Sequence, residues 1–162
     1  MTRSNENKSY IWLCFYLIAI LLLSLSMGMN AILFPVTMEG FKFSESSMGL
    51  VMAAETAAAL IVCLGLQWIF SRIGLTIAVL LALLFRLFSL VELSSSYEPA
   101  QWMLFVFIHG IGAYLMVIVL QTLISGLSFT RHRTLVNALF GVSLSLGYAV
   151  GPLIIETLNN YS

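Results

Sequence analysis

The chain has 162 residues, of which 60% are hydrophobic and 9% are charged, and its formal net charge is zero. A soluble domain carries about 25% charged residues, so this chain cannot build the polar shell that water requires. The balanced charge gives no basis for nucleic-acid binding. The composition therefore excludes an ordinary soluble domain and indicates that a lipid bilayer surrounds most of the chain.

Five apolar segments follow one another along the chain, and each is long enough to cross the hydrocarbon core of a bilayer as a helix. The alternating pattern of a β-barrel is absent, and helices are then the only spanning structure that satisfies its own backbone in lipid. The sequence predicts an all-α, polytopic membrane helix bundle. The expected spans are 10–34, 48–70, 75–93, 101–127 and 135–158, between tails of residues 1–9 and 159–162.

Basic residues in the short flanks predict the orientation of the chain. Five of them lie on the side of the first tail, and only Lys42 lies on the opposite side. The five are Arg3, Lys8, Arg72, Arg131 and Arg133. We therefore expect a cytoplasmic N-terminus. The membrane itself is expected to be a bacterial inner membrane. Trp12, Trp68 and Trp102 lie near span ends, which is typical of aromatic side chains at a membrane interface.

Three ionisable residues lie inside three consecutive spans. With a helical rise of about 1.5 Å per residue, Glu55, Arg86 and His109 each fall roughly 10 Å from the non-cytoplasmic surface, and Asn30 falls roughly 7 Å from it. A charge inside a membrane helix costs about 3 kcal/mol unless it is paired or wetted. Two interpretations stay open: a solute- or proton-binding cluster that lines an aqueous cavity, or an inert ion pair of Glu55 with Arg86 beside a packed histidine.

Patterns typical of soluble enzymes are missing from the sequence. It has neither a His-Glu-x-x-His nor a phosphate-binding Gly-Lys-Ser/Thr run, and it contains no aspartate that would help to build a metal cage. We therefore expect no enzymatic activity, no bound metal and no cofactor.

Two short stretches resemble signatures of the major facilitator superfamily of transporters. In "SRIG", Arg72 and Gly74 fit the Arg-x-Gly core of the family's loop between helices 2 and 3, which latches the two halves of such transporters together. In "GYAVGP", Gly147, Gly151 and Pro152 reproduce the Gly-x-x-x-Gly-Pro core of the family's helix-5 signature. That signature is associated with exporters and antiporters. The layout, with "TRHR" before the fifth span, is also similar to the YcaD-like branch.

The resemblance implies a function for the chain. It implies a transporter that moves a small solute by alternating access, with proton-coupled transport or efflux as the expected mode. Glu55, His109, Arg86 and Asn30 are the residues expected to bind the solute or protons. Members have two halves of six helices each, so this chain resembles an incomplete N-terminal half. A truncated gene, a split gene whose remaining helices form a separate chain, and a fragment are the three alternatives that stay open.

Two other hypotheses remain open from the sequence. One is a small membrane scaffold or accessory subunit that does not transport and that packs through Gly147 and Gly151 against a partner. The other is a non-functional remnant of a disrupted gene.

Overall fold

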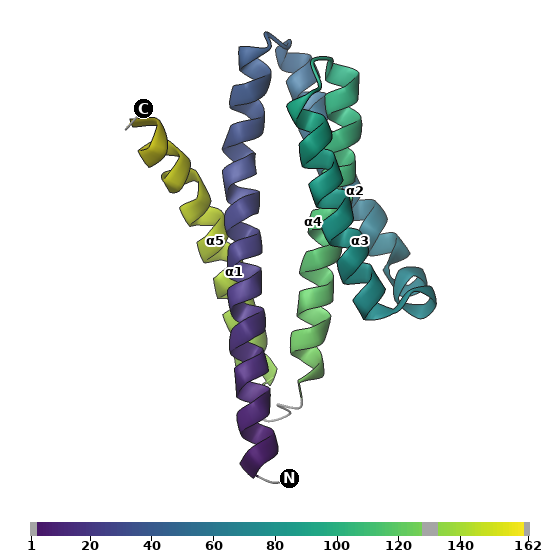
Figure 1. Cartoon of the computed structure of the whole chain (residues 1–162), viewed down its shortest axis with the longest axis vertical. Coiled ribbons are helices and arrows are strands. Elements are labelled where there is room, and N and C mark those ends of the chain that lie inside the picture. The colour runs from purple at the N-terminus through teal and green to yellow at the C-terminus, as the bar shows by residue number, and fades with distance from the viewer. Residues whose placement is uncertain (1–2, 128–132, 161–162) are drawn as a thin grey trace. The chain divides into compact units, whose positions relative to one another are not determined.

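The computed structural model describes residues 3–127 and 133–160, and these residues form five α-helices (Figure 1). Every one of the five is long and apolar enough to cross a membrane. The predicted all-α membrane helix bundle is confirmed. Arg131, used above to predict the orientation, lies outside the described residues. The helices are α1 (Arg3–Gly40), α2 (Glu45–Arg72), α3 (Gly74–Ser94), α4 (Pro99–Gly126) and α5 (Arg133–Asn160).

Helix α1 differs most from the expected boundaries. It begins at Arg3, inside the expected tail, and continues through Pro35 to Gly40. Proline removes one backbone donor from a helix, but a membrane helix tolerates this loss because its neighbours satisfy the freed groups. Burial on both sides of the proline favours the continued helix, since Phe34 is 6% exposed and Met38 is fully buried.

A Schellman motif ends α1 and turns the chain toward α2. The Phe43 amide donates to the Met38 carbonyl over 3.1 Å, and the Lys42 amide donates to the Glu39 carbonyl over 2.8 Å. Lys42 has a φ of 60°, the left-handed conformation that this motif requires. Ser44 then caps α2, because its side chain accepts a hydrogen bond from the Ser47 amide over 3.2 Å.

Helices α2 and α3 form a hairpin with a single residue between them. Helix α2 ends at Arg72, α3 begins at Gly74, and the Ile73 amide donates to the Ile69 carbonyl over 2.9 Å. Gly74 has a φ of 78°, which glycine adopts without the steric penalty of a side chain. The glycine of the Arg-x-Gly core therefore makes this tight reversal of direction possible.

The contacts divide the chain into two compact units. Unit 1 comprises residues 1–34 and 120–162, and unit 2 comprises residues 35–119. In unit 2 many buried side chains are small, so α2, α3 and α4 approach closely. The buried apolar residues of these three helices within unit 2 include Val51, Ala58, Val62, Ala78, Ala82, Val106 and Ala113. The buried residues of unit 1 include Leu13, Ile20, Ser24, Val136, Phe140 and Ile155.

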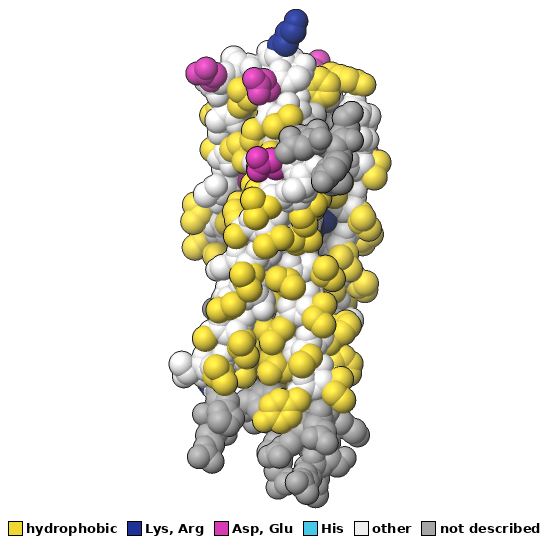
Figure 2. Space-filling view, turned by 90° about the vertical axis from the view of Figure 1, so that its left-hand side faces the viewer, with side chains coloured by type: hydrophobic (Ala, Val, Ile, Leu, Met, Phe, Trp, Pro, Cys, Tyr) yellow, Lys and Arg dark blue, Asp and Glu magenta, His cyan; other side chains and the backbone are white. Residues whose placement is uncertain are grey.

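Large apolar side chains cover the outside of the helices. Leu64 is 87% exposed, and hydrophobic side chains occupy most of the face drawn in Figure 2, where the acidic side chains lie toward one end. Soluble monomeric proteins rarely expose so large a continuous apolar surface to water. The surface therefore fits a bilayer, as the composition predicted.

Candidate functional site

Unit 2 brings the three ionisable residues of its helices together. Glu55 on α2 and Arg86 on α3 interact electrostatically, and Arg86 also interacts electrostatically with His109 on α4. His109 is fully buried, Arg86 is 7% exposed, and Glu55 is half-buried. The positive charge of the Arg86 guanidinium therefore acts on both the Glu55 carboxylate and the His109 imidazole. We call Glu55, Arg86 and His109 the polar cluster.

Glycines on α4 hold the helices of the cluster at close range. A Cβ atom at Gly110 would lie 3.1 Å from the Glu55 carbonyl oxygen and 2.9 Å from the Cβ atom of Ala58. A Cβ atom at Gly112 would lie 2.6 Å from the Ala82 carbonyl oxygen and 2.9 Å from Cγ of Arg86. Ordinary carbon contacts begin at about 3.5 Å. Helix α4 therefore touches α2 beside Glu55 and α3 beside Arg86, and neither approach has room for a side chain.

The Glu55 carboxylate makes neither a hydrogen bond nor an ion pair with another residue in the described part of the chain. Its interaction with Arg86 acts through space. The two interpretations of the sequence, a binding cluster or an inert ion pair of Glu55 with Arg86, both stay predictions. The cluster contains two groups that bind and release protons, a carboxylate and an imidazole, next to a guanidinium that stays positive.

Ser89 is a fourth member of this site, and sequence reasoning missed it. Its hydroxyl lies 3.2 Å from Nδ1 of His109 and 2.9 Å from the carbonyl oxygen of Arg86. Ser89 is fully buried. It follows Arg86 by three residues, and residues three apart share one face of a helix, so this spacing was the signal in the sequence.

Asn30, the fourth binding residue predicted from the sequence, lies on α1 in unit 1. Its side chain is half-buried. The contacts of unit 2 that define the polar cluster come from α2, α3 and α4, and a role for Asn30 stays a prediction.

The residues of the helix-5 signature pack against α1 within unit 1. A Cβ atom at Gly151 would lie 2.6 Å from both the Leu25 carbonyl oxygen and the Met29 amide nitrogen, and one at Gly147 would overlap the Ser24 side chain. The Ser24 hydroxyl donates to the Leu21 carbonyl over 3.0 Å. The signature glycines thus let two backbones touch, as small residues do between membrane helices.

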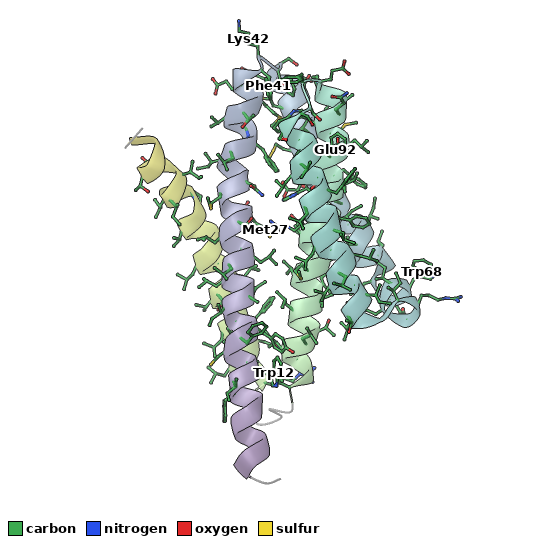
Figure 3. All side chains as sticks on the ribbon, viewed as in Figure 1. Trp12, Met27, Phe41, Lys42, Trp68 and Glu92 are labelled. Atoms are coloured by element: carbon green, nitrogen blue, oxygen red, sulfur yellow. The ribbon has the colours of Figure 1, made fainter. Side chains whose placement is uncertain are left out.

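The two remaining signature positions have simple local surroundings. Pro152 follows Gly151 inside α5, which continues through it to Asn160. Arg72 is the exposed last residue of α2, and Trp68, one turn earlier, lies at the same end of unit 2 (Figure 3).

Aromatic rings close the opposite end of unit 2. Phe41 stacks edge-on against Tyr97 and Trp102, with ring centroids 5.4 and 6.1 Å apart, and Phe43 lies 6.2 Å from Trp102. The Trp102 indole donates to the Ser96 carbonyl over 3.0 Å. Phe41 and Lys42 are labelled at this end in Figure 3.

The three tryptophans that lie near span ends differ in exposure. Trp12 and Trp68 are 53% and 64% exposed, but Trp102 is 2% exposed. The Trp102 ring is buried because Phe41 and Phe43 pack on it, and its indole N–H donates a hydrogen bond to the Ser96 carbonyl.

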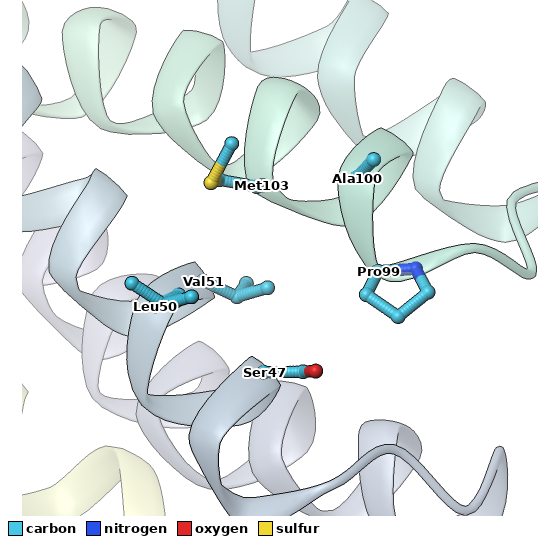
Figure 4. A pocket seen from close by; sticks show the side chains of 6 residues that line it. All are labelled: Ser47, Leu50, Val51, Pro99, Ala100 and Met103. Atoms are coloured by element: carbon cyan, nitrogen blue, oxygen red, sulfur yellow. The ribbon is translucent and has the colours of Figure 1, made fainter.

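A shallow groove of about 200 Å³ opens between α2 and α4 near the aromatic end of unit 2 (Figure 4). Its lining is mainly apolar, with one hydroxyl. The lining residues are Ser47, Leu50, Val51, Pro99, Ala100 and Met103. None of them belongs to the polar cluster, so the groove is a separate feature of this unit.

Five membrane-length helices with a buried polar cluster define an integral membrane protein of the polytopic helical class. The family model of the Major Facilitator Superfamily matches residues 16–162, and the chain belongs to this superfamily. Members of the superfamily are transporters of small solutes in lipid bilayers rather than enzymes. Searches of curated proteins and of solved structures returned no match.

Proposed function

We propose that the chain takes part in proton-coupled transport of a small solute. Glu55 and His109 are the proton-binding groups, and the positive charge of Arg86 acts on both of them. Family membership supports transport. The observation that carries the coupling is the Glu55 carboxylate, which lies inside a membrane helix without a direct ion pair to the other described residues. Intramembrane acids are functional candidates by default, because an idle one costs stability.

The cluster has the chemistry that alternating access requires at a binding site. A neutral carboxyl beside the positive Arg86 leaves a net positive site that attracts an anion, whereas an ionised carboxylate balances the guanidinium. Proton binding at Glu55 therefore changes the net charge of the Glu55–Arg86 pair from zero to positive, and a solute meets this difference. Such a dependence of solute affinity on protonation is what couples the two movements in a carrier.

The direction of transport is proposed as efflux. The support is the helix-5 signature at Gly147, Gly151 and Pro152, which the resemblance associates with exporters and antiporters. The YcaD-like branch and a role of Asn30 in binding the solute are part of the same proposal and rest on the sequence.

The proton part is tested by a pH jump on proteoliposomes adsorbed to a solid-supported membrane, where proton binding appears as a transient current. The wild-type chain gives a transient, and Glu55→Gln removes most of it while the chain keeps its normal abundance in the membrane. Glu156→Gln is the matched control, because Glu156 is an exposed carboxylate on α5. A full-size transient from Glu55→Gln would contradict the proposed role of this carboxylate.

The solute part uses the same liposomes with a pH-sensitive dye inside. We add an organic cation (tetraphenylphosphonium), an organic anion (benzoate) and a neutral sugar (galactose) at constant pH. Coupled transport predicts that at least one class moves protons, and that Glu55→Gln abolishes this movement. Proton movement that is equal in empty liposomes would remove the support for coupling.

The proposed orientation places the N-terminus in the cytoplasm of a bacterial inner membrane. Lys42 and Arg72 are both exposed and lie at opposite ends of unit 2, so they form a matched pair of reporters. In a background with Cys14 and Cys63 replaced by serine, Lys42→Cys reacts with an impermeant maleimide in intact cells, and Arg72→Cys reacts only after lysis. The reverse pattern would invert the orientation.

A further inference from the structure

The Ser89 hydroxyl connects two polar groups inside unit 2. Ser89 and His109 are both fully buried, and they come from α3 and α4. The hydroxyl oxygen lies 2.9 Å from the carbonyl oxygen of Arg86 and 3.2 Å from Nδ1 of His109. Both distances fall in the range of hydrogen bonds, so the protons that lie between these three atoms can be counted.

For these three atoms, the count leaves one arrangement in which both contacts are hydrogen bonds. A serine hydroxyl has a single proton to donate and two lone pairs to accept with, and a carbonyl oxygen can only accept. If Ser89 gave its proton to Nδ1 of His109, two oxygens would face each other at 2.9 Å without a proton between them. If Ser89 gives its proton to the Arg86 carbonyl instead, the hydroxyl accepts a proton from Nδ1, and both contacts are hydrogen bonds.

We propose that Ser89 is a positioning residue that holds neutral His109 in the Nδ1–H tautomer. The lone pair of the neutral ring then belongs to Nε2, and this nitrogen takes up and releases the exchangeable proton of the cluster. The second part rests on the proposed proton-coupled function. The first part describes the ring itself and stands without it.

The surrounding frame fixes the distance on which this inference depends. Gly112 lies against the backbone of α3 at Ala82 and Arg86, and it follows His109 on α4 by three residues. The separation of α3 and α4 at the level of Ser89 is therefore set by contacts to backbone rather than by the hydrogen bond. The charge that acts on the ring is that of Arg86 from α3. On α2, the backbone of Glu55 lies against Gly110, the residue after His109.

A fixed tautomer has a consequence for proton coupling. A histidine that interconverts between tautomers can take a proton on one side of its ring and release it from the other. With Nδ1–H engaged by Ser89, His109 takes up and releases its proton at the same nitrogen. The ring then binds a proton at one nitrogen, and the conformation of the protein decides from which side of the membrane this nitrogen is reached. The ring does not pass a proton from one of its nitrogens to the other.

The test is nitrogen NMR of the full chain in lipid, with ¹⁵N in the histidine rings. The sequence has two histidines, so His132→Gln leaves His109 as the single source of signal. At a pH where the ring is neutral, the wild-type residue shows its proton on Nδ1. In Ser89→Ala the ratio of the Nδ1–H to the Nε2–H tautomer falls about fivefold, the factor expected for one net hydrogen bond.

Ser94→Ala is the matched control. Ser94 lies on the same helix and also donates to the carbonyl three residues earlier, over 2.6 Å to Val91, but it is exposed. Its replacement leaves the His109 signals unchanged. The Nε2–H form in the wild-type chain overturns the proposal, and this measurement needs no variant that could misfold. An Nδ1–H form that persists unchanged in Ser89→Ala overturns the role of Ser89.

The two proposals fail separately. If His109 shows the Nδ1–H tautomer but the pH-jump transient of the wild-type chain is absent, the inference about Ser89 stands and proton coupling fails. If the transient is present but the ring carries its proton on Nε2, coupling stands and the positioning role of Ser89 fails.

Discussion

The contact between α1 and α5 makes a quantitative prediction for Gly151→Ala. The new Cβ atom would lie 2.6 Å from the Leu25 carbonyl oxygen, 2.6 Å from the Met29 amide nitrogen and 2.8 Å from the Gly28 carbonyl carbon. All three neighbours are backbone atoms and cannot rotate away. Since carbon contacts begin at about 3.5 Å, α5 must withdraw from α1 by roughly 1 Å.

A control in the same helix isolates the steric part of this effect. Gly141 is also inside α5, and a Cβ atom there would have nothing within 4 Å. Both substitutions gain about 0.5–1 kcal/mol, because alanine loses less backbone freedom than glycine in a helix. This gain cancels in the comparison. The difference between Gly151→Ala and Gly141→Ala is therefore the overpacking energy, about 1–3 kcal/mol in favour of Gly141→Ala.

The assay is reversible unfolding of the full chain in mixed micelles, with the fraction of denaturing detergent as the variable and helix content as the readout. Gly141→Ala unfolds at the wild-type midpoint or above it, and Gly151→Ala unfolds earlier. Equal midpoints for the two variants would refute the conclusion that the backbones of α1 and α5 touch at Gly151.

Two further predictions concern unit 2. Arg86→Met leaves Glu55 as an uncompensated charge inside a membrane helix and lowers the unfolding free energy by roughly 3 kcal/mol. Adding Glu55→Gln to this variant recovers most of the loss. If the effects of the two substitutions simply add, the two charges do not interact. Trp102→Phe keeps most of the buried ring but removes the donor to the Ser96 carbonyl, so the unfolding free energy falls by about 1 kcal/mol, and a loss below the error of the measurement would contradict the hydrogen bond.

The helices were predictable from the sequence because the requirement that creates them is local. A segment in lipid must satisfy its own backbone and must be long enough to span, and both properties can be read from about twenty consecutive residues. The end of α1 was not predictable in this way. The expected span ended at residue 34, but the helix continues through Pro35 and the buried Met38 to Gly40, where the left-handed turn at Lys42 follows.

The site was predictable in part for a related reason. Glu55, Arg86 and His109 are conspicuous because charged groups are rare in lipid, and equal depth on successive helices is a matter of counting residues. Ser89 was overlooked, since a serine in a membrane helix usually bonds its own backbone, and its second partner lies 20 residues away in the chain. The burial of Trp102 likewise depends on rings from another segment.

The glycines of α4 have a consequence for how such a chain can diversify. Gly110 and Gly112 let α4 lie against α2 and α3 at distances that leave no room for a side chain at either position. Descendants of this sequence can therefore exchange the polar side chains, the acid together with the arginine, and keep the same close approach of the helices. Evolution of a new specificity then needs few substitutions, while the two glycines accept almost none.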